Sequence, residues 1–180
     1  MPRYIALLRA INVGGRNRLT MATLRQMLCA LEFENVQTLL QSGNVVFDAA
    51  RTKSAMLETR LERETTERLG LNVDYLVRTQ RELETALAQN PFYCEAMDDP
   101  AHTALMFLKR DPTAQQVDAL RSTIRGREKI AAVGRHLYIV YPDGMGTSKF
   151  NGTRIEKCLA THGTMRNWNT LLKLAALADA

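Results

Sequence analysis

The sequence predicts an α+β fold built from two ferredoxin-like halves, a duplicated plait, and three observations lead to this prediction. Over the first 78 residues, strand-length apolar runs and amphipathic stretches follow the order β-α-β-β-α-β. From residue 103 onward the order returns as β-α-β-β-α and a terminal helix, without a convincing residue-level repeat. Between the two sets, residues 91–102 hold prolines and aspartates, as a linker does. We therefore expect domains at 1–95 and 96–180.

The first predicted strand, residues 4–11, is apolar on both faces of a period-2 pattern apart from Arg9. Such a pattern is typical of a strand at the centre of a sheet. A helix follows after Thr20, whose hydroxyl can cap its first turn. The apolar face of this helix is formed by Leu24, Met27, Leu28 and Leu31.

The next two strands, 36–40 and 45–47, are joined by residues 41–44, which contain the glycine and asparagine typical of a hairpin turn. A charged helix with leucines on one face then ends at Gly70. Residues 73–77 are expected to form the fourth strand of this half. These elements complete the β-α-β-β-α-β order of the first predicted plait.

The helix after this strand is predicted to begin at Thr79, because Thr79 and Glu82 have the spacing of a capping box. In the second half, a strand at 103–109 precedes a helix that Asp111 is expected to cap. Residues 129–133 and 137–141 are predicted to pair as a second hairpin through a Gly-Arg-His turn.

A polar loop, residues 142–149, leads to the next helix, and the terminal helix is expected to begin near Asn169. One face of the helix after the loop holds Ile155, Cys158, Leu159 and His162. A cysteine and a histidine provide only half of the ligands of a structural zinc site, so core packing is the better interpretation of this face. No metal site is predicted, and the sequence does not indicate whether the protein uses a cofactor.

The charge of the chain is mildly basic and unevenly distributed. It has 24 Lys and Arg against 19 Asp and Glu, which gives a net charge of +5. Residues 1–20 contain four arginines and no acid, whereas residues 82–99 contain five acids and no base. A local basic patch attracts phosphate or nucleic acid, although ordinary clustering on a solvated surface explains the same pattern.

Cysteine usage and hydropathy indicate a cytoplasmic protein. The 3 cysteines lie far apart and are odd in number, which fits a reducing compartment better than a disulfide scaffold. No apolar run approaches the roughly 18 residues of a membrane helix, and the N-terminus lacks the pattern of a signal peptide. We therefore expect no membrane partner.

Five separated motifs occur in the order 4–15, 41–47, 90–92, 141–146 and 166–170. Together they resemble the DUF1697 family, small bacterial proteins named for having no assigned function. The resemblance implies an α/β plait protein and implies no established reaction, substrate or cofactor. One departure is Ala10, where the family pattern usually has glycine. A methyl group there would matter if another backbone packed closely on the strand.

The loop after the first strand is the first candidate site. The backbone amides of Gly14 and Gly15 can form a concave anion-binding nest, with Arg16 and Arg18 adding positive charge. A simple turn capped by Asn17 is the alternative interpretation. The spacing does not match the dinucleotide-binding glycine fingerprint.

Arg9 stands out because its neighbours on the same strand face are apolar. A guanidinium in such a place must find a partner or reach water. Near the end of the strand it could point toward the same loop as Asn12. A paired or solvent-reaching structural arginine is the alternative.

The loop 143–149 contains glycines, hydroxyls and Lys149 directly before a predicted helix. It lacks the phosphate-loop spacing, so a nucleotide hydrolase of that type is not expected. Binding of a phosphate or carboxylate at the following helix N-terminus is a reasonable expectation. If the protein is an enzyme, Asp143 or His136 is the candidate titratable group.

The last candidate segment contains Trp168, the only tryptophan, beside an arginine and two asparagines. The indole could stack on a base or a sugar while its neighbours form hydrogen bonds to the ligand. Alternatively, Trp168 anchors the terminal helix, with Asn167 or Asn169 as its N-cap. The second interpretation accounts for the segment without a ligand.

We predict that the protein binds a small anionic or nucleotide-like ligand where the loops 12–18, 41–44, 143–149 and 164–169 converge. An RNA-binding module and an enzyme of unknown reaction are the alternatives. The RNA-recognition motif of plait proteins is absent from the sequence, which weakens the RNA alternative. The predicted ligand-binding residues are Arg9, Asn12, Gly14, Gly15, Arg16, Asn17, Gln41, Ser42, Asn44, Lys149, Arg166, Asn167 and Asn169.

Overall fold

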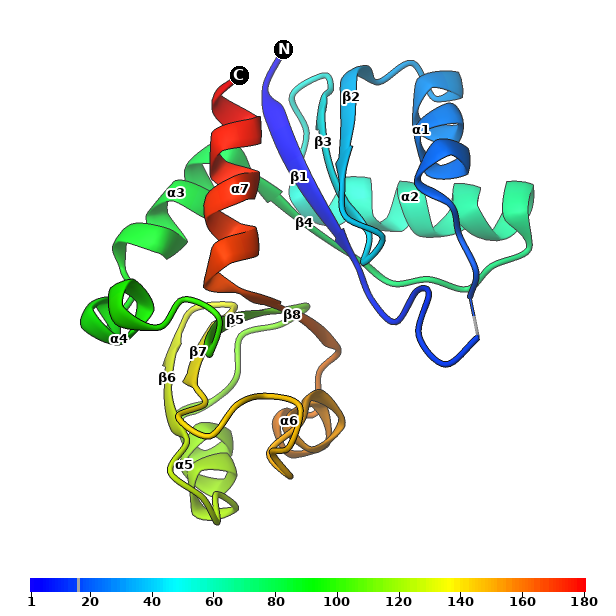
Figure 1. Ribbon diagram of the computed structural model, residues 1–180. Coiled ribbons are helices and arrows are strands. Elements are labelled where there is room, and N and C mark those ends of the chain that lie inside the picture. Colours follow the sequence, from blue (N-terminus) through cyan, green and yellow to red (C-terminus); the bar gives the residue numbers. More distant parts are fainter. Residues whose placement is uncertain (16) are drawn as a thin grey trace. The chain divides into compact units, whose positions relative to one another are not determined.

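The structure is a computed structural model that describes residues 1–15 and 17–180 (Figure 1). The chain divides into two compact units. The first unit consists of Met1–Thr85 together with Lys173–Ala180, and the second unit is Ala86–Leu172. Each unit contains one antiparallel sheet with helices on it.

The first unit is a ferredoxin-like plait. Its elements are β1 (Arg3–Leu8), α1 (Met21–Ala30), β2 (Glu34–Leu39), β3 (Asn44–Asp48), α2 (Ser54–Leu69) and β4 (Tyr75–Thr79). All strand pairs are antiparallel, in the order β2-β3-β1-β4. A helix follows β1 and another follows β3, so the predicted β-α-β-β-α-β arrangement of this half is confirmed.

The second unit has the same topology. Its elements are β5 (Thr103–Leu108), α5 (Ala114–Ser122), β6 (Lys129–Val133), β7 (His136–Val140), α6 (Gly152–Leu159) and β8 (Gly163–Asn167). The strands pair antiparallel in the order β6-β7-β5-β8, which corresponds strand for strand to the first sheet. The prediction of two ferredoxin-like halves is therefore confirmed.

Three further helices complete the described chain. α3 (Gln80–Ala88) follows β4, α4 (Tyr93–Asp98) follows α3, and α7 (Trp168–Asp179) follows β8. The units meet within α3 and α7 along the sequence, so each of these helices has residues in both units. The predicted domains at 1–95 and 96–180 stay a prediction.

Local signals place the helix ends where the sequence predicts them. Thr20 caps α1, since its hydroxyl oxygen accepts a hydrogen bond from the Thr23 amide at 3.1 Å. At the start of α3 the Thr79 amide donates to Glu82 at 2.7 Å, and the Glu82 amide donates to Thr79 at 3.1 Å. This is the predicted capping box. α2 ends at Gly70, whose φ of +65° favours glycine.

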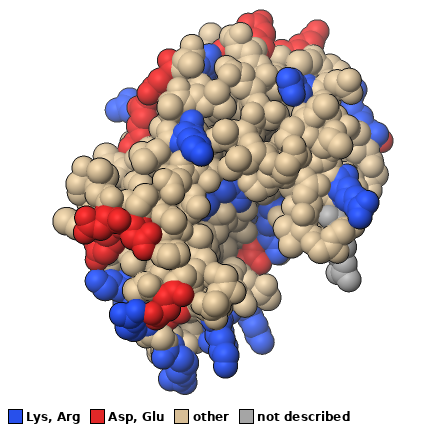
Figure 2. Space-filling view, in the orientation of Figure 1, with Lys and Arg blue, Asp and Glu red and all other residues tan. Residues whose placement is uncertain are grey.

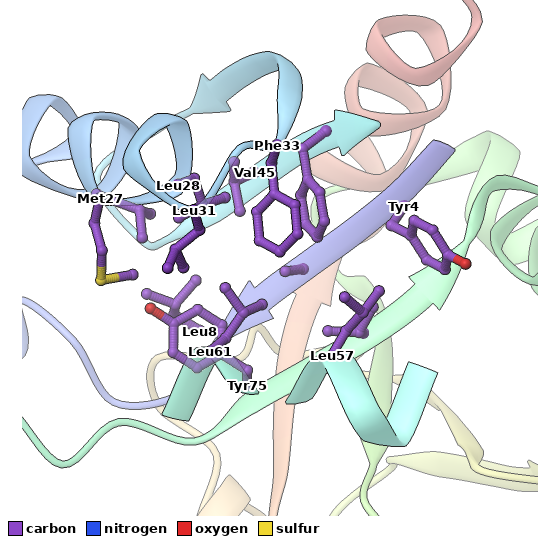
Figure 3. Packing of buried hydrophobic residues seen from close by; sticks show 14 of the residues in the cluster. Tyr4, Leu8, Met27, Leu28, Leu31, Phe33, Val45, Leu57, Leu61 and Tyr75 are labelled. Atoms are coloured by element: carbon purple, nitrogen blue, oxygen red, sulfur yellow. The ribbon is translucent and has the colours of Figure 1, made fainter. Parts of the chain in front are cut away.

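The core of the first unit lies between the sheet and helices α1 and α2 (Figure 3). Alternate residues of β1, among them Tyr4 and Leu8, point into it. The Phe33 and Phe47 rings stack with their centroids 4.7 Å apart. The second unit buries the corresponding alternate residues of β5 against α5 and α6. One helix-facing side of each sheet is thus filled by apolar side chains.

β1 ends at Leu8, three residues before the predicted end. The chain leaves the sheet because Ala10 and Asn12 have φ of +54° and +56°, outside the range of a strand. Ile11 is nevertheless buried in the same core, which explains why the apolar pattern extends beyond the strand. The left-handed conformation of Ala10 accounts for the glycine usual in the family, so backbone conformation rather than close packing decides this position.

In the second half, the helix cap and one strand differ from the predictions. Thr113, not Asp111, caps α5, because Thr113 and Gln116 form a reciprocal capping box. β8 was not predicted, because its sequence, GTMRN, lacks an apolar alternation. Its place is secured by pairing with β5, an interaction distant in sequence.

Two further elements differ at their bounds. Residues 91–102, predicted as a linker, include the short helix α4. Here the Asn90 side-chain oxygen accepts a hydrogen bond from the Phe92 amide at 2.9 Å just before the helix. α7 begins at Trp168, because the Asn167 side chain caps it through the Thr170 amide at 2.9 Å. Among residues 1–15 and 17–180, none of the helices combines the length and apolar character needed to cross a membrane.

Candidate functional site

In the first unit, the structure brings together two of the four predicted loops through Asn12. The Asn12 amide group donates to the Gln41 carbonyl at 2.8 Å and to the Leu19 carbonyl at 2.9 Å. Its oxygen accepts a hydrogen bond from the Leu19 amide at 2.9 Å. Asn12 therefore closes its own loop and fastens it to the β2–β3 hairpin, and its polar groups have structural partners.

Two other predicted residues of these loops, Asn17 and Asn44, also form hydrogen bonds to the backbone. Asn44 is buried and donates to the Leu39 carbonyl at 2.8 Å and to the Ser42 hydroxyl at 3.1 Å. Asn17 donates to the Ala10 carbonyl at 3.4 Å. Gly14 and Gly15 are exposed and left-handed, with φ of +59° and +75°.

Arg9 has an acidic partner. Its guanidinium lies 3.3 Å from a carboxylate oxygen of Asp74, and both side chains are about 30% exposed. The paired structural arginine was one of the two interpretations of this residue. Arg16 lies outside the described residues. Ligand binding by this loop cluster stays a prediction.

Arg166, Asn167 and Asn169 lie at the end of β8 and the start of α7. Arg166 is buried, and burial lowers the pKa of its guanidinium to about 10. It donates to the Thr164 hydroxyl and to the Met165 carbonyl, both at 2.8 Å. Asn167 caps α7, whereas Asn169 is exposed. Trp168 is 3% exposed, as expected for a residue that anchors the helix.

The loop 143–149 is held by its own polar side chains. Asp143 forms a two-point ion pair with Arg127, in which one contact joins Nε and Oδ2 at 3.1 Å. The Arg127 hydrogen bond lowers the pKa of the Asp143 carboxyl, so Asp143 stays ionised at neutral pH. The Thr147 hydroxyl donates to the Asp143 carbonyl at 3.1 Å, so this hydroxyl stabilises the loop itself.

This loop forms one wall of a pocket, which we call the α6 pocket, with a volume of about 280 Å³. Its lining residues are Arg125, Gly126, Glu128, Asp143, Gly144, Thr147, Ser148, Lys149, Phe150 and Arg154. The volume is just below the roughly 300–1,000 Å³ typical of ligand sites, which favours a small ligand over a dinucleotide.

The α6 pocket has an excess of positive charge. Arg125, Lys149 and Arg154 contribute three cations against the carboxylates of Glu128 and Asp143. Asp143 is already paired with Arg127, which does not line the pocket. The first turn of α6 adds the positive end of its helix dipole, since Asn151 and Arg154 form the N-cap contact at 3.1 Å.

A larger pocket of about 520 Å³ lies at the opposite end of α6. It is lined by Lys109, Arg110 and Lys157, among others. Arg110 donates to the Ala160 carbonyl at 2.6 Å, so its charge is engaged by the C-terminal end of the helix. Cations at a helix C-terminus are a common stabilising arrangement, and this pocket therefore gives a weaker indication of an anionic ligand.

Comparisons with known proteins give the family but no activity. The model of DUF1697, a protein family of unknown function, matches residues 1–138. The chain belongs to the DUF1697 family. No curated protein matches the sequence. Among solved structures, the chain is similar to a conserved bacterial protein from Streptococcus pneumoniae, with 25% identity, a TM-score of 0.73 and 98% of each chain covered.

The DUF1697 resemblance noted in the sequence is thus confirmed, and the family description assigns no reaction. Sequence reasoning identified Lys149 and the loop before α6, but it missed Arg125, Glu128 and Arg154 as members of the same pocket. Arg154 could have been found, because it lies in the first turn of the helix whose N-terminus was singled out. No group of His, Cys, Asp and Glu suited to a metal ion occurs in the described part of the chain.

Proposed function

We propose that this DUF1697 protein binds a small anionic ligand, such as a phosphomonoester, in the α6 pocket. The observation that carries the proposal is the convergence of Arg125, Lys149 and Arg154 on one pocket whose carboxylate Asp143 is neutralised from outside. Charged donors bind phosphate oxygens more strongly than neutral donors do. The adjacent N-terminus of α6 stabilises the same charge.

The pocket needs only residues of the second unit, so the proposal does not depend on the convergence of all four predicted loops. Lys149 is the predicted ligand-binding residue that lines it. Arg125 and Lys149 are both exposed, so their charges are free to reorient toward an anion that enters from solvent.

Isothermal titration with inorganic phosphate at constant ionic strength tests the proposal. We expect Arg125→Gln to weaken phosphate binding about tenfold, equivalent to roughly 1.4 kcal/mol, since one charged donor is lost. Lys157→Gln is the matched control, because Lys157 is an exposed cation of α6 that does not line the pocket. Absence of phosphate binding, or an equal effect of both substitutions, would refute the proposal.

Binding to the RNA backbone is the second candidate, and the surface charge favours it to some extent. Lys and Arg side chains gather at the end of the second unit where α5 and α6 lie (Figure 2). The exposed cations of this region include Arg121, Arg125, Arg127, Arg154 and Lys157.

Two of these cations are already engaged, since Arg121 pairs with Asp118 and Arg127 pairs with Asp143. The remaining positive charge is small for a nucleic-acid groove, which makes the small ligand the better candidate. A short RNA whose binding weakens steeply with salt, while inorganic phosphate does not bind, would favour the second candidate instead.

A further inference from the structure

Glu128 occupies an unusual position in the α6 pocket. The Ser148 hydroxyl donates a hydrogen bond to its Oε1, and the Ser148 oxygen in turn accepts from the Phe150 amide at 3.0 Å. The other carboxylate oxygen, Oε2, is buried and receives no hydrogen bond from residues 1–15 or 17–180. One side of this carboxylate is therefore held by the protein, and the other side lacks a donor.

The backbone at Gly126 makes room for this carboxylate. A Cβ atom at Gly126 would lie 2.5 Å from Glu128 Oε2, closer than real Cβ contacts allow. The carboxylate thus fills the space that a side chain at position 126 would take. The Ser148 hydroxyl holds the carboxylate at Oε1, and the glycine at position 126 leaves the space that Oε2 occupies.

A buried acceptor without a donor costs free energy, and a charged one costs more than a neutral one. Such an atom gains most from a ligand that carries a hydrogen-bond donor. An ammonium donor is disfavoured, because Arg125, Lys149 and Arg154 line the same pocket and repel a cation. A neutral hydroxyl satisfies the carboxylate without this repulsion.

We infer that the ligand of the α6 pocket is a hydroxylated phosphomonoester, a polyol phosphate or a sugar phosphate, whose hydroxyl donates to the Glu128 carboxylate. Because Oε2 is buried in this structure, ligand binding includes a turn of the flexible Glu128 side chain that brings Oε2 to the pocket surface. This inference rests on the proposed function, because the cations of the pocket bind the phosphate and Glu128 recognises the hydroxyl. The volume of about 280 Å³ suits a ligand of this size. Glu128 acts here as a specificity residue.

The test compares glycerol 3-phosphate with propyl phosphate, a ligand of similar size that has no free hydroxyl on its carbon chain. We expect the wild-type protein to bind glycerol 3-phosphate roughly tenfold more tightly in isothermal titration, because only that ligand satisfies Oε2. Inorganic phosphate serves as the common reference for the anionic part of the site.

Glu128→Gln separates recognition of the hydroxyl by Glu128 from binding of the phosphate by the cations of the pocket. The glutamine keeps an oxygen for the Ser148 hydroxyl and places an NH₂ group, which only donates, where Oε2 stood. We expect the preference for glycerol 3-phosphate to become smaller, because a neutral amide–hydroxyl hydrogen bond replaces the stronger bond to a carboxylate. Propyl phosphate should bind this variant at least as tightly as it binds the wild type, because a negative charge is removed from the pocket.

Asp118→Asn is the matched control, since Asp118 is an exposed acid of α5 outside the pocket and should leave the preference unchanged. Equal binding of both phosphomonoesters to the wild type would overturn the inference while leaving the proposed function intact. A preference in Glu128→Gln that is as large as in the wild type would overturn the assignment to Glu128. Failure of all three phosphates to bind would instead refute the proposed function.

Discussion

The two halves of the protein share a strand order but place their long connections differently. In the first half the connection from β1 to α1, residues 9–20, is long, and the connection from β3 to α2, residues 49–53, is short. In the second half the lengths are exchanged, with 109–113 after β5 and 141–151 after β7. The plait tolerates extra length at either end of the sheet, and each half places its distinctive loop where the other half has a tight turn.

The ends of the central strands are nevertheless alike at the level of single hydrogen bonds. The Leu8 amide donates to the Gly43 carbonyl at 2.8 Å, and the Leu108 amide donates to the Arg135 carbonyl at 2.9 Å. The next residue repeats the match. The Arg9 amide donates to the Asp74 carbonyl at 3.0 Å, and the Lys109 amide donates to the His162 carbonyl at 2.9 Å. The loops vary while the strand ends do not.

A residue-level repeat becomes visible when the strands are aligned by their pairing. Arg78 pairs with Ile5 across the first sheet, and Arg166 pairs with Leu105 at the corresponding position of the second sheet. Each arginine is buried and donates from Nη1 to the preceding carbonyl at 2.8 Å. The residue after each arginine caps the helix that follows, with Thr79 capping α3 and Asn167 capping α7.

A glutamate repeats in the same manner. Glu62 of α2 accepts a hydrogen bond from the Tyr75 amide at 3.0 Å, and Glu156 of α6 accepts one from the Gly163 amide at 2.8 Å. Tyr75 and Gly163 are the first residues of β4 and β8. The repeated positions are thus polar groups that complete the edge of each sheet, where the backbone lacks a neighbouring strand.

The two equivalent arginines should differ most strongly in their contribution to stability. Arg78 lies 3.7 Å from Glu58, and both side chains are buried. Arg78→Met should reduce the free energy of unfolding by about 3–5 kcal/mol, because Glu58 is left as a buried charge. Arg166→Met should cost less, since burial already disfavours the charged form of Arg166 and lowers its pKa to about 10. Urea unfolding measures both.

Glu58→Gln provides the control for this comparison. In the Arg78→Met background it removes the remaining charge and keeps an acceptor for the Val77 amide, which donates to Glu58 at 2.8 Å. The double variant should therefore recover part of the lost stability. Equal losses for the two arginine variants would show that the repeat is energetically symmetric.

Alkaline pH should destabilise the second half more than the first. Burial raises the pKa of Tyr75 to about 12 in the first unit. In the second unit burial raises the pKa of Tyr138 to about 12, and it also raises that of Tyr141. Tyrosines with a raised pKa stabilise the fold below their unfolded pKa near 10, and this contribution is lost as the pH rises through the folded pKa.

At about pH 11 each such tyrosine should cost on the order of 1 kcal/mol of stability relative to neutral pH. Trp168, the only tryptophan and a buried residue of the second unit, reports on that unit by its fluorescence. Alkaline pH should lower the midpoint urea concentration of unfolding for both probes. We expect the midpoint followed by Trp168 fluorescence to fall further than the midpoint followed by far-ultraviolet circular dichroism, which reports on the whole chain. Coincident shifts would contradict this expectation.

The smallest effect concerns two equivalent helix ends. α2 ends at Gly70 with φ of +65°, and α6 ends at Ala160 with φ of +50°. Gly70→Ala should destabilise the protein by about 1 kcal/mol, because open space surrounds the position and only backbone strain is added. Ala160→Gly should stabilise it by up to about 1 kcal/mol for the opposite reason.

Ala119→Gly serves as the control, since Ala119 is an exposed residue within α5 and glycine should cost about 1 kcal/mol there. Thermal unfolding of the four proteins gives the order directly. A destabilising Ala160→Gly would mean that the left-handed end of α6 is not a source of strain.

Sequence patterns predicted most elements because their signals are local. Thr20, Thr79 and Gly70 mark helix ends through contacts within a few residues, and the caps form where expected. β8 escaped prediction because a short polar strand is held by β5, not by its own composition. Asp111 was predicted as the cap because proline at the first helical position is a common pattern, whereas the reciprocal Thr113–Gln116 hydrogen bonds decide the cap.

The candidate site likewise combines residues that local sequence signals indicate with residues that only the pairing of distant segments brings together. Lys149 and the N-terminus of α6 could be predicted because the loop and the helix are adjacent in sequence. Arg125 and Glu128 belong to the connection before β6, and only the pairing of β6 with β7 brings that connection to the loop. Asn12 illustrates a contact that the sequence did not indicate, since its side chain holds the Leu19 and Gln41 backbone. Its predicted binding of a ligand stays a prediction.

The order of the residues alone indicates that the chain folds as two α+β halves, that most of its helices begin at particular caps, and that its polar loops follow the strands. These features depend on hydrophobic periodicity and on hydrogen bonds between near neighbours, which are written in the order of the residues. Only the tertiary structure shows that β8 forms, that Arg78 and Arg166 occupy equivalent buried positions, and that Ser148 binds Glu128. These depend on strand pairing between distant segments, which sets the burial and the charge around each side chain.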